Sequence, residues 1–177
     1  MDRLFAFSNW KKAGVFLAVN FFVQAIIVWI IYPQISPTLQ PLDVRVGLTP
    51  ETIAQFLSDI GSAGRDLYFI NEATLDMLFP LIYSFAYALL LIELLKANEL
   101  HHSLARYWVL VPLGIGLCDV SENLFLLSTI HSFPDQNSLV AQGLGIANMA
   151  KHGLTIVGIG LIFFYAGRLV LVKKRRP

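Results

Sequence analysis

Residues 112–130 read PLGIGLCDVSENLFLLSTI, and this stretch decides how the rest of the chain is interpreted. It is apolar and about as long as a helix that crosses a bilayer, which takes roughly 20 residues. Its centre nevertheless carries Asp119, Glu122 and Asn123. Ionisable groups at that depth are costly, so they need partners or a function. The stretch predicts a membrane-spanning helix whose polar face turns toward other helices.

The composition of the whole chain is typical of a membrane protein. Of its 177 residues, 56% are hydrophobic and only 14% are charged, whereas soluble domains carry about 25% charged residues. The net charge of +1 gives no reason to expect nucleic acid as a partner. The single cysteine, Cys118, cannot form a disulfide within the chain. The fold therefore has to be held together by packing and polar contacts.

Four apolar segments predict an all-α fold, a four-helix transmembrane bundle that forms a single membrane domain over residues 1–177. The predicted spans cover about residues 13–32, 75–95, 107–130 and 140–172. Membrane lipid is then an expected partner of the whole surface.

The connector 33–73 between the first two spans contains a short amphipathic helix. Thr49 and Pro50 suit a helix start. Ile53, Phe56 and Leu57 then recur at helical spacing. Three placements are open for this helix. It lies on the membrane surface, it covers the bundle as a lid, or it packs on other loops.

The basic residues predict the orientation. With four spans, the N-terminal head, the 96–106 turn and the C-terminal tail share one side, which collects 10 of the 13 Lys and Arg residues. By the positive-inside rule both termini of this multi-pass protein face the cytoplasm, and the connector faces outward. The membrane itself is expected to be a bacterial inner (plasma) membrane.

Polar residues on all four predicted spans fall at one depth, and Gln24 is the one on the first span. Asp76 and Tyr83 share a stripe of the second span, and Pro80 between them leaves the carbonyl of Asp76 without its helical donor. Asp119 shares a face of the third span with Glu122 and Asn123, because steps of 3 and 4 residues return to nearly the same side of a helix. In the fourth span Lys151 and His152 lie at the corresponding level.

This convergence predicts a polar pocket that opens toward the outer face and binds a small amphipathic or lipid-like molecule. Asp119 and Glu122 are the candidate catalytic acid and base, because a carboxyl group that gains and loses a proton can transfer it to a ligand. Six further residues are candidate binding residues: Asn123 and Tyr83 would orient the ligand, Lys151 and His152 would set the charge or hold an anionic group, and Asp76 and Arg65 would line the mouth.

Other interpretations stay open, and the sequence leaves undecided whether the chain is an enzyme. The polar cluster could serve only as glue between helices in an accessory or scaffolding subunit. It could also belong to a proton-coupled transport subunit. No metal and no cofactor is expected, because His152 has no second histidine at its depth and phosphate-binding or zinc motifs are missing from the sequence.

Glycines on the fourth span suggest an association surface. Gly153, Gly160 and Gly167 recur every seven residues and would let another helix approach closely, which predicts a homo-oligomer.

Several motifs between residues 48 and 155 resemble a group of uncharacterised bacterial four-helix membrane proteins. They are Gly64-Arg65-Asp66-Leu67-Tyr68, Leu75-Asp76, Phe79-Pro80, Tyr83, Pro112, Asp119-Val120-Ser121-Glu122-Asn123 and Lys151 with Thr155. The resemblance implies the four-helix architecture and no activity. The architecture is also loosely similar to the sterol-isomerase-like four-helix proteins, whose bundles hold acidic residues over a lipid pocket.

Overall fold

A computed structural model describes residues 1–174, and over this part the chain is helical. Helices account for 84% of the chain and the described residues contain no strand, so the prediction of an all-α fold is confirmed. The helices are, in order, α1 (Asp2–Phe7), α2 (Trp10–Ile26), a π-helical turn (Ile27–Ile31), α3 (Tyr32–Ile35), α4 (Pro50–Asp59), α5 (Gly61–Ala73), α6 (Leu75–Ala97), α7 (Leu110–His131) and α8 (Ser138–Lys174), with short 3₁₀ turns at Leu42–Val44 and Leu104–Val109.

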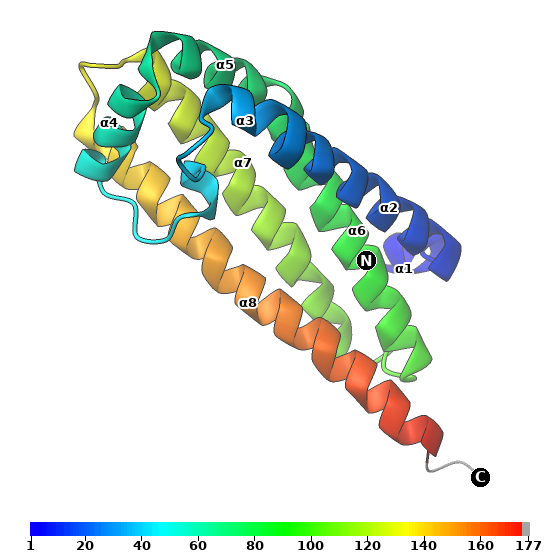
Figure 1. Cartoon of the computed structure of the whole chain (residues 1–177). Helices are drawn as coiled ribbons and strands as arrows, with labels where there is room; N and C mark the ends of the chain where they lie inside the picture. The colour runs from blue at the N-terminus through cyan, green and yellow to red at the C-terminus, as the bar shows by residue number, and fades with distance from the viewer. Residues whose placement is uncertain (175–177) are drawn as a thin grey trace.

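Four helical stretches are long and apolar enough to cross a membrane, as the sequence predicts. They cover Trp10–Ile35, Gly61–Ala97, Leu104–His131 and Ser138–Leu171. In Figure 1 α2, α6, α7 and α8 lie side by side as an elongated bundle, with both chain ends toward the same end. Apolar side chains such as Phe22, Leu117 and Ile156 are 67%, 69% and 73% exposed on its outside. Such a surface suits lipid rather than water.

The second long stretch begins earlier than the sequence predicts. The last part of the predicted connector 33–73 is helical, because α5 runs from Gly61 to Ala73 and meets α6 at Thr74. The composition of α5 is too polar to signal a membrane span by itself. Its buried face nevertheless joins the bundle through Gly64, Tyr68, Asn71 and Glu72.

The amphipathic helix α4 covers one end of the bundle. The Thr49 side chain accepts a hydrogen bond from the backbone N–H of Thr52, which caps the helix as predicted. Ile53, Phe56 and Leu57 are almost fully buried. They pack in an apolar cluster with residues from the ends of α3, α7 and α8, namely Tyr32, Ile35, Leu126, Ile130, Ala141 and Leu144. Of the three predicted placements, the structure shows α4 as a lid over the end of the bundle.

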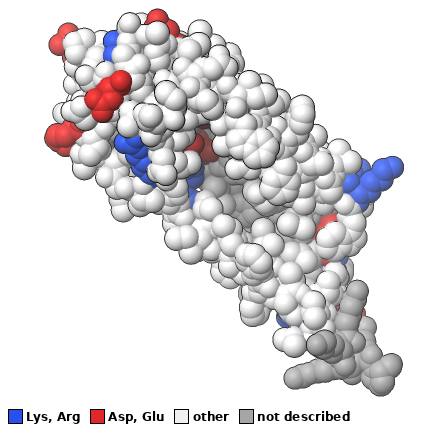
Figure 2. Space-filling view, viewed as in Figure 1, with Lys and Arg blue, Asp and Glu red and all other residues white. Residues whose placement is uncertain are grey.

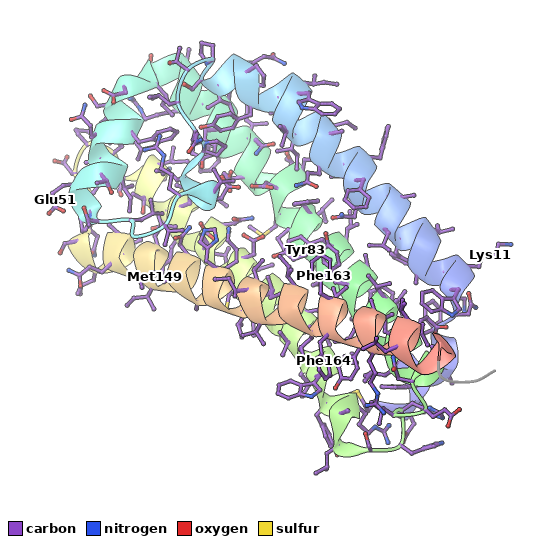
Figure 3. All side chains as sticks on the ribbon, turned by 60° about the horizontal axis from the view of Figure 1, so that its bottom comes forward. Lys11, Glu51, Tyr83, Met149, Phe163 and Phe164 are labelled. Atoms are coloured by element: carbon purple, nitrogen blue, oxygen red, sulfur yellow. The ribbon has the colours of Figure 1, made fainter. Side chains whose placement is uncertain are left out.

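A second apolar cluster fills the opposite end of the bundle. It joins the last turns of α6, including Leu91 and Leu95, to Val109 and to Tyr165 of α8. Buried polar residues of α6, α7 and α8 lie between the two clusters along the chain. The bundle therefore has an apolar core at each end and a polar layer between them. In Figure 3 Lys11 and Glu51 mark the two ends, and Tyr83 lies between the helices.

One glycine sets how closely α6 and α7 approach in this polar layer. A Cβ atom added to Gly116 would lie 2.6 Å from Oγ of Ser84 and 2.9 Å from the carbonyl oxygen of Pro80. Only a residue without a side chain fits there. The basic tail Lys173–Arg176, on which the predicted orientation partly depends, lies outside the residues whose side chains are described.

Candidate functional site

The ammonium group of Lys151 on α8 bridges two carboxylates of α7. Its Nζ lies 3.1 Å from Oδ1 of Asp119 and 2.5 Å from Oε2 of Glu122. Glu122 is fully buried, and Lys151 and Asp119 are each 8% exposed. The spacing of three residues between the two acids places both carboxylates on the face of α7 that meets α8. Lys151 thus forms an ion pair with each acid across these two helices.

Two further side chains complete this cluster from neighbouring positions. The hydroxyl group of Tyr83 on α6 donates a hydrogen bond of 2.9 Å to Oδ2 of Asp119. The amide of Asn148, one turn before Lys151, donates one of 3.0 Å to Oε1 of Glu122. Both oxygens of each carboxylate therefore have a partner.

Asn123, which follows Glu122 on α7, contacts Asp76 on α6, the residue whose backbone oxygen Pro80 leaves without a helical donor. Its Nδ2 donates a hydrogen bond of 2.8 Å to the backbone oxygen of Asp76. Pro80 has no N–H to offer this oxygen, so the Asn123 amide replaces the missing helical bond. This bond uses only the backbone of Asp76, and its side chain lines the neighbouring cavity.

Asp76 faces a cavity of about 280 Å³ between the end of the first long helix, the connector and α5–α6. The lining is Gln24, Ile27, Val28, Tyr32, Gln40, Pro41, Asp43, Val44, Tyr68, Asn71, Glu72, Asp76 and Phe79. Figure 2 shows acidic surface inside a hollow in this face of the molecule, whereas most of the surrounding surface is uncharged. The cavity thus joins carboxyl groups to apolar and aromatic walls.

The connector brings Asp43 to this cavity, over the Lys151 cluster. Burial raises the pKa of Asp43 above its ordinary value of 3.8, the positive charge of Lys151 lowers it, and the negative charge of Asp119 raises it further. These effects mean that the connector, the cavity and the cluster share one electrostatic environment.

Two predicted site residues lie apart from the cluster. Nε2 of His152 lies 3.2 Å from the backbone oxygen of Arg45, so the ring contacts the connector. The guanidinium group of Arg65 donates to the backbone oxygen of Leu57 and lies over the ring of Phe133. The structure thus brings together Asp119, Glu122, Lys151, Tyr83 and Asn123 with the backbone of Asp76, and it leaves His152 and Arg65 in other contacts.

Sequence reasoning missed several residues of the cavity, among them Tyr68, Asn71 and Glu72. They belong to α5, which had been assigned to the connector. The spacing of 68, 72 and 76 could have revealed them, because steps of four residues form one helix stripe that continues into α6. Asp43 gave no such signal, since only the folding of the connector brings it there.

The described residues contain no group of three or more His, Cys, Asp or Glu side chains placed to hold a metal ion. The carboxylates of the cluster instead have an ammonium group as their counter-ion. Chemically, this arrangement offers a charge network held by Lys151 beside a cavity lined by the carboxyl groups of Asp43, Glu72 and Asp76.

Comparison with protein families, with curated proteins and with solved structures finds no match to this chain. Its function has to be argued from the geometry.

Proposed function

We propose that this membrane protein binds a small amphipathic or lipid-like molecule in the cavity between α2–α3, the connector and α5–α6. The observation that carries the proposal is the lining of the cavity. Apolar side chains of Ile27, Val28 and Phe79 face carboxyl groups of Asp76 and Glu72 across one space. A molecule with a polar and an apolar part satisfies both kinds of wall, as is usual for small-molecule sites.

The position of the cavity also favours a ligand that arrives from the membrane. Val28 lines the cavity and is 50% exposed on the outside of the bundle. The π-helical turn at Ile27–Ile31 widens the first long helix at this place, and such turns are frequent at functional sites. We place the cavity in the outer half of a bacterial inner membrane, with both chain ends cytoplasmic, as the distribution of basic residues predicts.

Acid–base chemistry belongs to the same proposal, with Asp119 and Glu122 as the proton-transferring residues. They share the single ammonium group of Lys151, so the cluster has more carboxylates than cations. A continuous chain of polar contacts runs from Tyr83 through Asp119 and Lys151 to Glu122. A proton added to this chain neutralises the excess charge, and it could be passed to a bound molecule through Asp76.

A cavity-filling substitution tests the binding step. The full-length protein, reconstituted with total bacterial lipid extract, is analysed by native mass spectrometry for a stoichiometric adduct. Ile27→Trp fills the cavity and should abolish the adduct. Ile30→Trp is the matched control, because Ile30 lies one turn further on the same stretch, is 58% exposed and does not line the cavity.

Loss of the adduct in Ile27→Trp alone supports the proposal. A native protein without any adduct, or equal adducts in both variants, contradicts it. For the acid–base step, the infrared band of a protonated carboxylic acid should be present at neutral pH and should disappear in Glu122→Gln or Asp119→Asn. Its absence from the native protein removes proton transfer from the proposal and leaves binding.

A structural role is the second candidate, and the closed geometry of the cluster favours it. Glu122 is 0% exposed and both of its oxygens are taken by Asn148 and Lys151. In an accessory or scaffolding subunit this network would only fix the contact of α7 and α8. Under this role Asp119→Asn lowers thermal stability and assembly, while the adduct in the cavity is either absent or unchanged. A proton-coupled transport subunit instead requires flux in proteoliposomes that Glu122→Gln abolishes.

A further inference from the structure

The cavity carries carboxyl groups without counter-ions. Glu72 and Asp76 are 1% and 8% exposed, and Asp43 lines the same space. None of the three takes part in an ion pair within residues 1–171. Lys151, the nearest buried cation, is already held by Asp119 and Glu122. Arg45 donates to the backbone oxygen of Gln40 instead.

Several buried polar atoms around the same cavity also lack hydrogen-bond partners. The hydroxyl groups of Tyr32 and Tyr68, Oδ1 of Asn71 and Oε2 of Glu72 are buried and have no hydrogen-bond partner among the described residues. Tyr68 is 1% exposed and Tyr32 is 8% exposed. Buried polar groups are almost always hydrogen-bonded, so several unpartnered ones around one cavity point to a ligand.

These two observations together define the chemistry of that ligand. Carboxylate oxygens and the oxygen of Asn71 accept hydrogen bonds, and a tyrosine oxygen can also accept one. The site therefore offers several acceptors, besides the O–H donors of the two tyrosines, and it lacks a positive charge. A metal ion is a poor fit, because the carboxyl groups do not converge as a ligand set within the described chain. An organic ammonium group supplies both the charge and the N–H donors.

We infer that the cavity binds a small organic ammonium ion, whose charged end meets Glu72 and Asp76 and whose apolar part lies among Tyr32, Tyr68 and Phe79. This inference rests on the proposed function and names the class of its ligand. The volume of about 280 Å³ is near the lower end for small-molecule sites, so the ligand is small. The aromatic lining suits a cation as well as an apolar group.

The ammonium group could belong to a soluble amine or to an aminolipid headgroup. The aminolipid carries a phosphate beside its ammonium group, which the acidic lining would repel. Two experiments distinguish a soluble amine from an aminolipid headgroup. In the first, the full-length protein in phosphatidylglycerol nanodiscs is titrated with 2-phenylethylammonium by calorimetry. In the second, phosphatidylethanolamine replaces half of the lipid, and native mass spectrometry detects any bound copy.

The charge is tested with an uncharged probe and with charge-removing variants. We expect 2-phenylethylammonium to bind at least tenfold more tightly than 2-phenylethanol, which has nearly the same shape. Glu72→Gln and Asp76→Asn should each weaken binding of the ammonium probe by at least tenfold. Asp66→Asn is the matched control, because Asp66 lies exposed on α5, the helix of Glu72, and outside the cavity. This variant should bind the ammonium probe as tightly as the native protein.

Tyr68→Phe separates a loss of binding from a loss of folding. It removes a buried hydroxyl group without a partner, so the ligand-free protein should be at least as heat-stable as the native one. Binding of the ammonium probe should nevertheless weaken several-fold. A purely structural role of Tyr68 would move the two measurements in the same direction.

The outcomes separate this inference from the proposed function. Equal binding of both probes, insensitive to Glu72→Gln, overturns the ammonium inference while the amphipathic site stands. Retention of phosphatidylethanolamine together with loss of 2-phenylethylammonium binding identifies the aminolipid as the source and supports the inference. If neither probe binds and no lipid adduct forms, both the inference and the proposed function fail.

Discussion

The side-chain amide of Asn123 donates a hydrogen bond of 2.8 Å to the backbone oxygen of Asp76. This oxygen is the one that Pro80 cannot serve, since proline has no N–H. A hydrogen bond missing from the backbone of α6 is thus replaced by one from a side chain of α7. This hydrogen bond ties the two helices together at the point where the cavity meets the Lys151 cluster.

The coupling of Asn123 to Pro80 can be measured by a double-mutant cycle. Asn123→Ala leaves the Asp76 oxygen buried without a donor and should lower the free energy of unfolding by about 1–3 kcal/mol. In a Pro80→Ala background the alanine N–H serves this oxygen, so the cost of Asn123→Ala should be smaller by about 0.5 kcal/mol or more. Unfolding in mixed detergent with increasing dodecyl sulfate measures all four proteins. Additive costs would show that the amide acts elsewhere.

Lys151 should be the residue of the cluster whose loss costs most. Lys151→Met leaves Asp119 and Glu122 buried beside each other without a cation, and breaking such a pair costs about 3–5 kcal/mol. Adding Asp119→Asn and Glu122→Gln removes the two charges and should restore most of the thermal stability. A Lys151→Met protein as heat-stable as the native one would mean that the carboxylates are not charged in the fold.

The sequence predicts most of this cluster because it depends on local order. Asp119, Glu122 and Asn123 share a helix face through their spacing, and the cost of burying them requires a cation, which Lys151 supplies at the same depth. Pro80 likewise predicts that the carbonyl of Asp76 lacks its helical hydrogen-bond donor. Helix geometry and the cost of burying a charge in the membrane are sufficient to predict these contacts.

The cavity is different because it depends on how the connector folds. Asp43 reaches the cavity only after the connector turns back over the helices, and no periodicity in the sequence predicts that turn. Glu72 was missed for another reason, since α5 is too polar to be recognised as part of a span. His152 was expected to face the carboxylates, but its neighbour Lys151 occupies that face and the ring turns to the connector.

The pH dependence of stability should report the burial of Asp43. Burial raises the pKa of this carboxyl above its ordinary value of 3.8. The folded protein then holds the proton more tightly than the unfolded chain, so this residue makes stability fall as the pH rises from about 3.8 through the raised pKa. Asp43→Asn should therefore raise the Tm at pH values above the raised pKa and leave it unchanged in strong acid.

Glu51 provides a control of opposite sign for this experiment. It lies exposed in the first turn of α4, where a hydrogen bond from Thr49 lowers the pKa of its carboxyl. Its contribution is present above its ordinary pKa and is lost as the pH falls. Glu51→Gln should thus slightly lower the Tm at neutral pH, whereas Asp43→Asn should raise it. Thermal unfolding followed by circular dichroism over a pH series compares the two, and an unchanged pH profile in Asp43→Asn would contradict the assignment.

The glycine seam of α8 gives a prediction about association. Gly153, Gly160 and Gly167 are exposed, and a Cβ atom added to any of them meets nothing within 4 Å. No contact within the described bundle therefore requires these glycines, and close approach of another helix is the use that small residues serve in membranes. Gly160→Leu should leave the thermal stability of the monomer unchanged and weaken self-association by about tenfold, or roughly 1.4 kcal/mol.

Gly158 on the same helix is the matched control for this prediction, because its position faces inward. A Cβ atom there would lie 3.2 Å from Cδ1 of Ile115 on α7. Gly158→Leu should lower the stability of the monomer by about 1–3 kcal/mol through overpacking. Light scattering after size exclusion, together with energy transfer between labelled chains in liposomes, separates the two effects. Association of Gly160→Leu at native strength would assign the seam to lipid contact and not to a second copy of the chain.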